Sequence, residues 1–197
     1  TQPGNTNASQ IQAANDSGGV FATNAVGDYT YTFKTKAPAT FDPAVTHAIG
    51  ISANRNLSEF ITQAETSAVG NDVFNFVPNG APVTVTRSVV PTAVCNNCHD
   101  PMFGHGGSRL TVELCILCHT PQTINPDTQL SQDMPVLIHK IHMGVNLPSV
   151  KAGTPYQIIG FQQSVNDYST VVFPVGSDVR NCTICHTPAA TQAKNYI

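Results

Sequence analysis

The first 92 residues alternate between apolar and polar positions with a period of two, which is the pattern of half-buried β-strands. Clusters of Pro, Gly, Asn and Asp separate the alternating runs, and the sequence VPNGAP at residues 77–82 predicts a turn. Several short strands at this spacing predict an antiparallel β-sandwich or barrel over residues 1–92. The expected strands lie within residues 28–36, 44–52, 72–77 and 82–90.

One helix is predicted in the second half of the chain, within residues 131–144. Asp133 is its candidate cap, Pro135 lies in its first turn and Gly144 follows its end. This helix contains His139 and His142, which are three residues apart and therefore share one face.

Residues 93–197 are predicted to form a second domain that is mostly irregular and contains few short helices. A strand pair is expected there over residues 156–162 and 168–175. The fold class is therefore mainly β, with an N-terminal β-domain followed by a C-terminal domain that is mostly irregular and has few short helices.

Charge and hydropathy narrow the range of partners. Charged residues make up 11% of the chain and the formal net charge is −3, so the basic surface of a nucleic-acid-binding protein is absent. No apolar run approaches the roughly 20 residues that a transmembrane helix needs. We therefore expect neither a nucleic-acid partner nor a transmembrane segment.

All six cysteines fall in C-x-x-C pairs, and a histidine follows each pair directly. This is the pattern of c-type haem attachment. The two thiols add across the two vinyl groups of haem, and the adjacent imidazole binds the iron as its proximal ligand. Three covalently bound haems c are therefore predicted. The motifs are Cys95, Cys98 and His99; Cys115, Cys118 and His119; and Cys182, Cys185 and His186.

Two other uses of cysteine explain the motifs less well. Three disulfides would not require a histidine after each pair, and a C-x-x-C disulfide is usually redox-active rather than structural. Zinc binds two C-x-x-C pairs in many proteins, but it has no need for a histidine directly after each second cysteine.

The covalent haem motifs also indicate how closely the haems are packed and where the protein is located. The motifs lie within residues 95–186, roughly 30 residues per haem, which is too little protein to enclose each group separately. The haems are therefore expected to lie close together and to supply much of the core. Because haem is attached after export, the chain is expected in the periplasm, at the outer-membrane surface or outside the cell.

Four histidines outside the motifs are candidates for the sixth iron position. His105, His139 and His142 are the predicted distal ligands, in a pairing that the sequence leaves open. Glycines flank His105 and allow a close approach to a ring, more readily that of a neighbouring haem than of its own. His47 lies in a predicted strand, where a structural, hydrogen-bonded histidine is expected. Met102 and Met143 are lower-ranked alternatives, since a thioether can replace imidazole.

Several segments together resemble the OmcA/MtrC-type outer-membrane multihaem cytochromes. These are CNNCHDPMFGHGG, CILCHTPQT, VLIHKIHMGVNLPSV and YSTVVFPVGSDVRNCTICH, with YTYTF and THAIGI upstream. The resemblance covers most of the chain from about residue 28. It implies a β-domain before a haem domain, bis-histidine irons, and electron delivery to extracellular acceptors or to other multihaem cytochromes. Members of the family typically carry more haems than the three motifs here.

Electron transfer without catalysis is the predicted function, because an iron with two protein ligands has no open position for a substrate. One alternative is a multihaem reductase, which needs one iron left open. Another is a self-assembling protomer of an extracellular cytochrome filament, to which His47 is available as a ligand for a neighbouring subunit.

Overall fold

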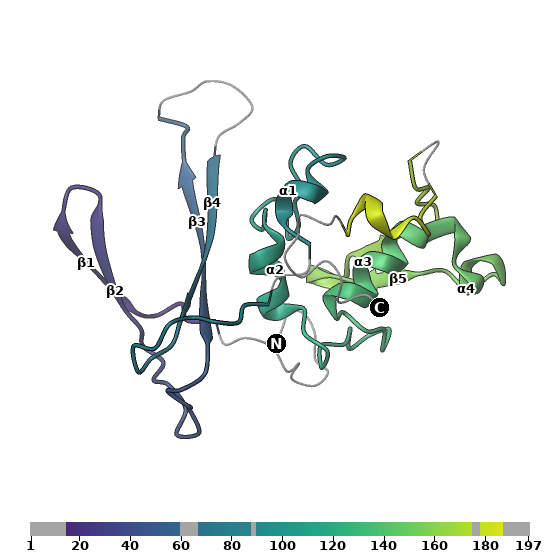
Figure 1. The fold of residues 1–197 in the computed structure, drawn as a ribbon. Helices are drawn as coiled ribbons and strands as arrows, with labels where there is room; N and C mark the ends of the chain where they lie inside the picture. The colour runs from purple at the N-terminus through teal and green to yellow at the C-terminus, as the bar shows by residue number, and fades with distance from the viewer. Residues whose placement is uncertain (1–14, 60–66, 88–89, 175–177, 187–197) are drawn as a thin grey trace.

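The computed structural model describes residues 15–59, 67–87, 90–174 and 178–186. Two β-hairpins from the first half of the chain stand at one end of the molecule, and the half that contains the cysteines forms the other end (Figure 1). The two halves predicted from the sequence therefore differ in secondary structure, with hairpins in the first half and mainly short helices and turns in the second. The boundary itself, at residues 92 and 93, stays a prediction.

The first hairpin pairs β1 (Val20–Ala25) with β2 (Asp28–Thr32) in antiparallel register. Gly27 adopts a φ of 81° in the connecting turn, a conformation that glycine reaches without strain. On one face, the ring of Phe21 lies 4.6 Å from that of Tyr31, which lies 5.1 Å from that of Phe33. The aromatic alternation thus forms a ladder across the two strands, as the period of two requires.

The second hairpin pairs β3 (His47–Asn56) with β4 (Ser67–Phe76) over ten residues of each strand. A Cβ atom on Gly50 would lie 2.6 Å from Cδ1 of Leu117 and even closer to Cδ1 of Leu114, both in α2. The absence of a side chain at Gly50 therefore lets the hairpin pack directly on this helix.

The mainly β character with few short helices is confirmed. The strands that the structure describes form three separate two-stranded sheets, and no closed barrel is found among them. The strands β3 and β4 pack on α2. The turn at residues 77–82 is confirmed, with the Gly80 amide donating to the Val77 carbonyl at 2.9 Å.

The strand expected over residues 82–90 is not formed in the described part of this segment. Residues 82–87 are irregular, and residues 88–89 lie outside the described residues. This segment connects the hairpin to α1, and its Arg87 side chain is bound to α2. It therefore serves as a link between the two halves instead of a third strand.

The second half contains short elements separated by turns. They are α1 (Thr92–Cys95), α2 (Val112–Cys118), α3 (Met134–Met143), η1 (Gly144–Asn146), α4 (Pro148–Lys151), β5 (Gln157–Ile159), η2 (Phe161–Gln163), β6 (Val165–Asp167) and η3 (Cys182–Ile184). The strand expected over residues 156–162 is confirmed as β5. Its partner is β6 and not the segment 168–175, because the short turn after Gly160 returns the chain at once.

The predicted helix is confirmed as α3, with Asp133 before it, Pro135 in its first turn and Gly144 at its end. One side of α3 contributes to a small apolar core that is formed by Leu137, Leu147, Tyr156 and Ile158. The opposite side presents His139 and His142 toward the cysteine motifs. So small a core is consistent with a domain that obtains part of its packing from bound groups.

Candidate functional site

Each C-x-x-C-H motif folds into one turn of helix. In all three, the amide of the histidine donates a hydrogen bond to the carbonyl of the first cysteine, four residues earlier. This turn brings two thiols and one imidazole to the same side of the backbone, as attachment to one macrocycle requires. The distances are 3.0 Å for His99–Cys95, 2.9 Å for His119–Cys115 and 2.7 Å for His186–Cys182.

The six thiols are unpaired, and the pKa of four of them is raised. Burial is the main cause that raises the pKa of each of these thiols, which keeps them protonated. A redox-active C-x-x-C pair has the opposite property, a thiol whose pKa is lowered. The arrangement is therefore unlike that of a dithiol oxidoreductase. The four thiols are those of Cys95, Cys115, Cys118 and Cys185.

Each motif histidine faces one histidine from outside the motifs. The structure thus forms three imidazole pairs, and the three predicted distal ligands are used once each. The ring centres are 6.2 Å apart in the pair His99–His142, 6.0 Å in His105–His119 and 6.1 Å in His139–His186.

These separations fit a single iron between the two rings of each pair. Two metal–imidazole bonds of about 2.0 Å, with about 1.1 Å more from each nitrogen to its ring centre, place collinear ligating rings about 6.2 Å apart. All three observed values agree with this distance. Two thiols stand beside each pair, so the residues present fit three covalently attached haems with histidine on both sides.

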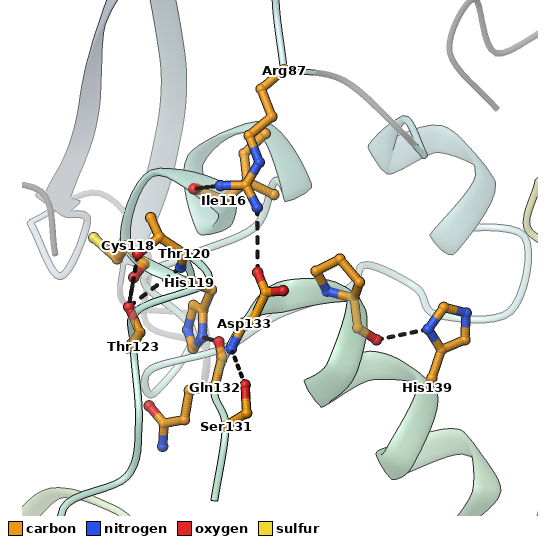
Figure 2. Close-up of polar contacts among 11 residues, drawn as sticks. Arg87, Ile116, Cys118, His119, Thr120, Thr123, Ser131, Gln132, Asp133 and His139 are labelled. Carbon is orange, nitrogen blue, oxygen red and sulfur yellow. Dashed lines mark hydrogen bonds and ion pairs between the residues drawn. The ribbon is translucent and has the colours of Figure 1, made fainter. Parts of the chain in front are cut away.

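Backbone carbonyls orient three of these imidazoles. Nδ1 of His119 lies 2.8 Å from the carbonyl oxygen of Gln132, and Nδ1 of His139 lies 2.7 Å from that of Pro135 (Figure 2). Nδ1 of His142 lies 2.9 Å from the carbonyl oxygen of Ile138. A carbonyl accepts only from a protonated Nδ1, so Nε2 of each ring keeps its lone pair for a metal.

The pKa of two further imidazoles is lowered. Burial lowers the pKa of His105, and the neighbouring His119 ring and Arg109 guanidinium lower it further. Burial and the adjacent His139 ring lower the pKa of His186. The neutral ring is the form that binds iron, so a lowered pKa favours ligation by these two rings.

His105 reaches its partner through a tight loop over residues 104–109. The backbones of Gly104 and Arg109 bond to each other at 2.8 and 3.2 Å and close this loop. His105 itself has a φ of 50°, and the next two residues, both glycines, have φ values of 68° and 86°. The loop turns the ring toward His119 of the second motif.

His47 belongs to none of the three pairs. Its Nε2 lies 2.7 Å from the carbonyl oxygen of Asp42, and its ring stacks on Phe41 with centres 4.3 Å apart. This half-buried, hydrogen-bonded position agrees with the structural role expected for it. Of the two methionines named as alternative ligands, Met143 packs against the apolar core.

Arg87 links two elements of the site and was not singled out from the sequence. Its guanidinium donates to the carbonyl of Ile116 in α2 at 2.8 Å and lies 3.5 Å from the Asp133 carboxylate at the start of α3 (Figure 2). It thereby joins the helix of the second motif to the helix that presents His139 and His142. No local pattern marks this role, because the three elements are distant in the sequence.

Three helical C-x-x-C-H turns, each facing a second imidazole, define the chain as a multihaem c-type cytochrome domain. Residues 87–196 match the family model of the outer membrane cytochrome MtrC/MtrF-like proteins, domains II/IV, and the chain belongs to this family. The match places the chain among cytochromes of the outer-membrane or extracellular surface. No helix among the described residues is long and apolar enough to span a membrane.

Two individual proteins illustrate the relationship. The chain is 27% identical over 195 residues to "Multiheme cytochrome MtrC" of Shewanella baltica (strain OS185), covering 85% of this chain and 29% of that protein. It is 26% identical to the crystal structure of the outer membrane decaheme cytochrome OmcA, with a TM-score of 0.70 over 87% of this chain and 25% of that one. The chain thus spans less than a third of the length of these relatives.

Proposed function

We propose that this chain carries single electrons through three covalently bound haems, each held between two histidines. The observation that carries this proposal is the one-to-one pairing of motif histidines with His105, His139 and His142 at 6.0–6.2 Å between ring centres. When bound, haem iron supplies one-electron chemistry without a change in covalent bonds.

Thiols, imidazoles and backbone carbonyls have different roles in holding the three groups. Thiols fix each group to a helical turn, and the motif histidines approach from the same turn. The carbonyls of Gln132, Pro135 and Ile138 keep three of the imidazoles in one tautomer. With both faces of each iron occupied, the chain excludes substrates and external ligands.

Helix α3 relates two of the three sites to each other. His139 and His142 belong to one helix and face the third and first motifs, so these two sites are neighbours across α3. The third motif accordingly lies beside α3, as the yellow segment of Figure 1.

The two alternative functions receive less support. A reductase needs an iron with one imidazole only, whereas every motif histidine here faces a second ring. A filament protomer needs a histidine to offer to a neighbour, and His47 is already engaged by Asp42 and Phe41. Other multihaem cytochromes and extracellular electron acceptors are the proposed partners, with the β-hairpins as a docking or spacing module.

Substitution of single histidines tests the proposal. In the haem-loaded protein, His105→Ala, His139→Ala and His142→Ala are each expected to open one iron, so that carbon monoxide binds one haem of the expected three after reduction. His47→Ala is the matched control and is expected to bind none. Intact mass gives the number of haems, and low-temperature electron paramagnetic resonance (EPR) gives their ligands. An altered iron signal in His47→Ala, with every signal unchanged in one of the other variants, would refute the assignment.

A further inference from the structure

The segment between α2 and α3 folds back on the second motif. Its middle part, residues 123–132, is a narrow loop in which Ile124 and Ser131 form an antiparallel bridge. The Gln132 amide donates to the Thr123 carbonyl at 2.8 Å and joins the two ends of this loop. Thr123 is 2% exposed and Gln132 is 6% exposed, so water does not compete for the bonds at this junction.

Each end of the 123–132 loop contacts one residue of the motif (Figure 2). At one end, the Gln132 carbonyl accepts from Nδ1 of His119 at 2.8 Å. At the other end, the Thr123 hydroxyl donates to the Cys118 carbonyl at 2.8 Å. Cys118 and His119 are consecutive residues, an attachment thiol and a proximal ligand. One small loop therefore holds the backbone of the first and the ring of the second.

The carbonyl that orients His119 differs in origin from those that orient the histidines of α3. Nδ1 of His139 and Nδ1 of His142 bond to carbonyls four residues earlier in their own helix, so helix geometry fixes these bonds. The carbonyl of Gln132 lies 13 residues after His119, in a separate segment. Its position therefore depends on the contacts that hold the 123–132 loop against the motif.

The Thr123 hydroxyl is a side-chain contact of this kind. Its own proton goes to the Cys118 carbonyl, so its oxygen accepts from the amide and the hydroxyl of Thr120, at 3.3 and 3.0 Å. A buried hydroxyl with bonds on both sides is held in one orientation. Valine has nearly the same shape and can form none of these bonds, so substitution separates the hydroxyl from the packing.

We propose that Thr123 is a positioning residue for the second haem, because its hydroxyl anchors the 123–132 loop to the motif. This anchoring keeps the Gln132 carbonyl in line with Nδ1 of His119. The proposal rests on the proposed function, since it assumes a haem attached through Cys115 and Cys118. A hydrogen bond from Nδ1 fixes the orientation of a ligating imidazole and makes it a stronger electron donor. Thr123 thus contributes to both the ring orientation and the reduction potential at this site.

Removal of the hydroxyl is expected to make the second haem about threefold easier to reduce. Without the anchor the Nδ1 bond weakens, the imidazole donates less charge to the iron, and the reduced state is favoured. Loss of a direct outer-shell partner changes a metal site by roughly 10–100-fold, and Thr123 acts one bond further away, so its effect is smaller. Threefold corresponds to about 28 mV, because tenfold is about 59 mV for one electron.

Three variants separate positioning from a general loosening of the loop. Thr123→Val removes the hydroxyl, and Thr123→Ser keeps it. Thr128→Val is the matched control, because the Thr128 hydroxyl donates to Oδ1 of Asn125 at 2.9 Å within the same loop. Thr123→Val and Thr128→Val each remove one hydroxyl from the loop, but only the first removes a bond to the motif.

The test is an EPR-monitored redox titration of the haem-loaded protein. The signal of the second haem is identified by its loss in His105→Ala. Thr123→Val is expected to shift the g values and the potential of that signal and to leave the other two haems unchanged. Thr123→Ser is expected to restore both properties, and Thr128→Val to change neither. An equal shift in Thr128→Val would overturn the positioning role.

Failure of the positioning role is distinguishable from failure of the proposed function. If His105→Ala removes no low-spin signal, the assignment of His105 as a ligand is wrong. If it does remove one, but Thr123→Val leaves the g values and the potential of that haem unchanged, the positioning role alone is overturned. Should Thr123→Val not mature with three haems, Thr120→Val decides, because it removes a bond to the same hydroxyl. An unchanged signal in that variant would then overturn the proposal.

Discussion

Replacing Gly144 by alanine is expected to destabilise the helix that presents two of the candidate ligands. Gly144 ends α3 with a φ of 42°, and the Val145 amide beside it donates to the Val171 carbonyl at 3.0 Å. An added Cβ would lie 2.7 Å from the Val171 carbonyl carbon and closer still to its oxygen. Backbone atoms cannot rotate away as the end of a side chain can, so α3 and the segment at Val171 must separate.

The magnitude follows from two contributions. A non-glycine residue in the left-handed region costs about 1–2 kcal/mol, and insertion of a methyl group against fixed atoms costs about 1–3 kcal/mol. The free energy of unfolding should therefore fall by about 3 kcal/mol, which lowers the melting temperature of a chain of this size by about 6–12 °C. Thermal unfolding of the haem-loaded protein, followed by circular dichroism, measures the change.

Gly153→Ala is the matched control. Gly153 has a φ of 89°, but an added Cβ there would meet no atom within 4 Å. It should lose only the backbone contribution, about 1–2 kcal/mol. Equal melting temperatures for the two variants would show that the Val171 segment yields freely, and the argument from close packing at Gly144 would then be wrong.

Two further predictions concern contacts within the chain. Arg87→Met should lower the free energy of unfolding by about 1 kcal/mol, because it removes the link between Ile116 in α2 and Asp133 at the start of α3. The partial exposure of Arg87 limits this loss. Denaturant titrations measure it, and a loss no larger than that of Arg55→Met would contradict the argument. A hydrogen bond from the Tyr31 hydroxyl is the main cause that lowers the pKa of Asp16 from 3.8 to about 2. The ionised carboxylate therefore anchors the end of β2 above about pH 4, and this anchoring should be lost as the pH falls toward 2. Hydrogen exchange of the Lys34 and Thr35 amides measures this, and protection that is independent of pH over that range, or equal in Asp16→Asn, would be inconsistent with it.

Local chemistry made the haem motifs and α3 predictable from the sequence. A C-x-x-C-H motif occupies one helical turn, so its two thiols and its imidazole share a side of the backbone whatever the rest of the chain does. The helix at Met134–Met143 is similarly determined by neighbours in the sequence, from Asp133 and Pro135 at its start to Gly144 at its end. The expectation that His47 is structural also came from its place in an alternating run.

The packing of the β-hairpins was harder to predict from the sequence. Alternation predicts a strand with one buried face but does not say what covers that face. Here Gly50 lets β3 approach Leu114 and Leu117 of α2, so the hairpin packs on a helix. The same docking brings Ser52 to Arg109, a contact between residues 57 positions apart. Nothing near either residue in the sequence indicates the other.

The sequence by itself thus indicated the candidate residues for attaching and ligating haem, whereas only the tertiary structure decided which of them lie together. Four spare histidines were visible from the start, but their pairing depends on where α3 and the loop at residues 104–109 lie in space. His139 and His142 are one helical turn apart, and yet they face motifs that are separated by more than eighty residues, His186 and His99. Local spacing limits what one turn of backbone can present. The partner across an iron is set by long-range packing, which brings distant segments together through many weak contacts that no short motif encodes.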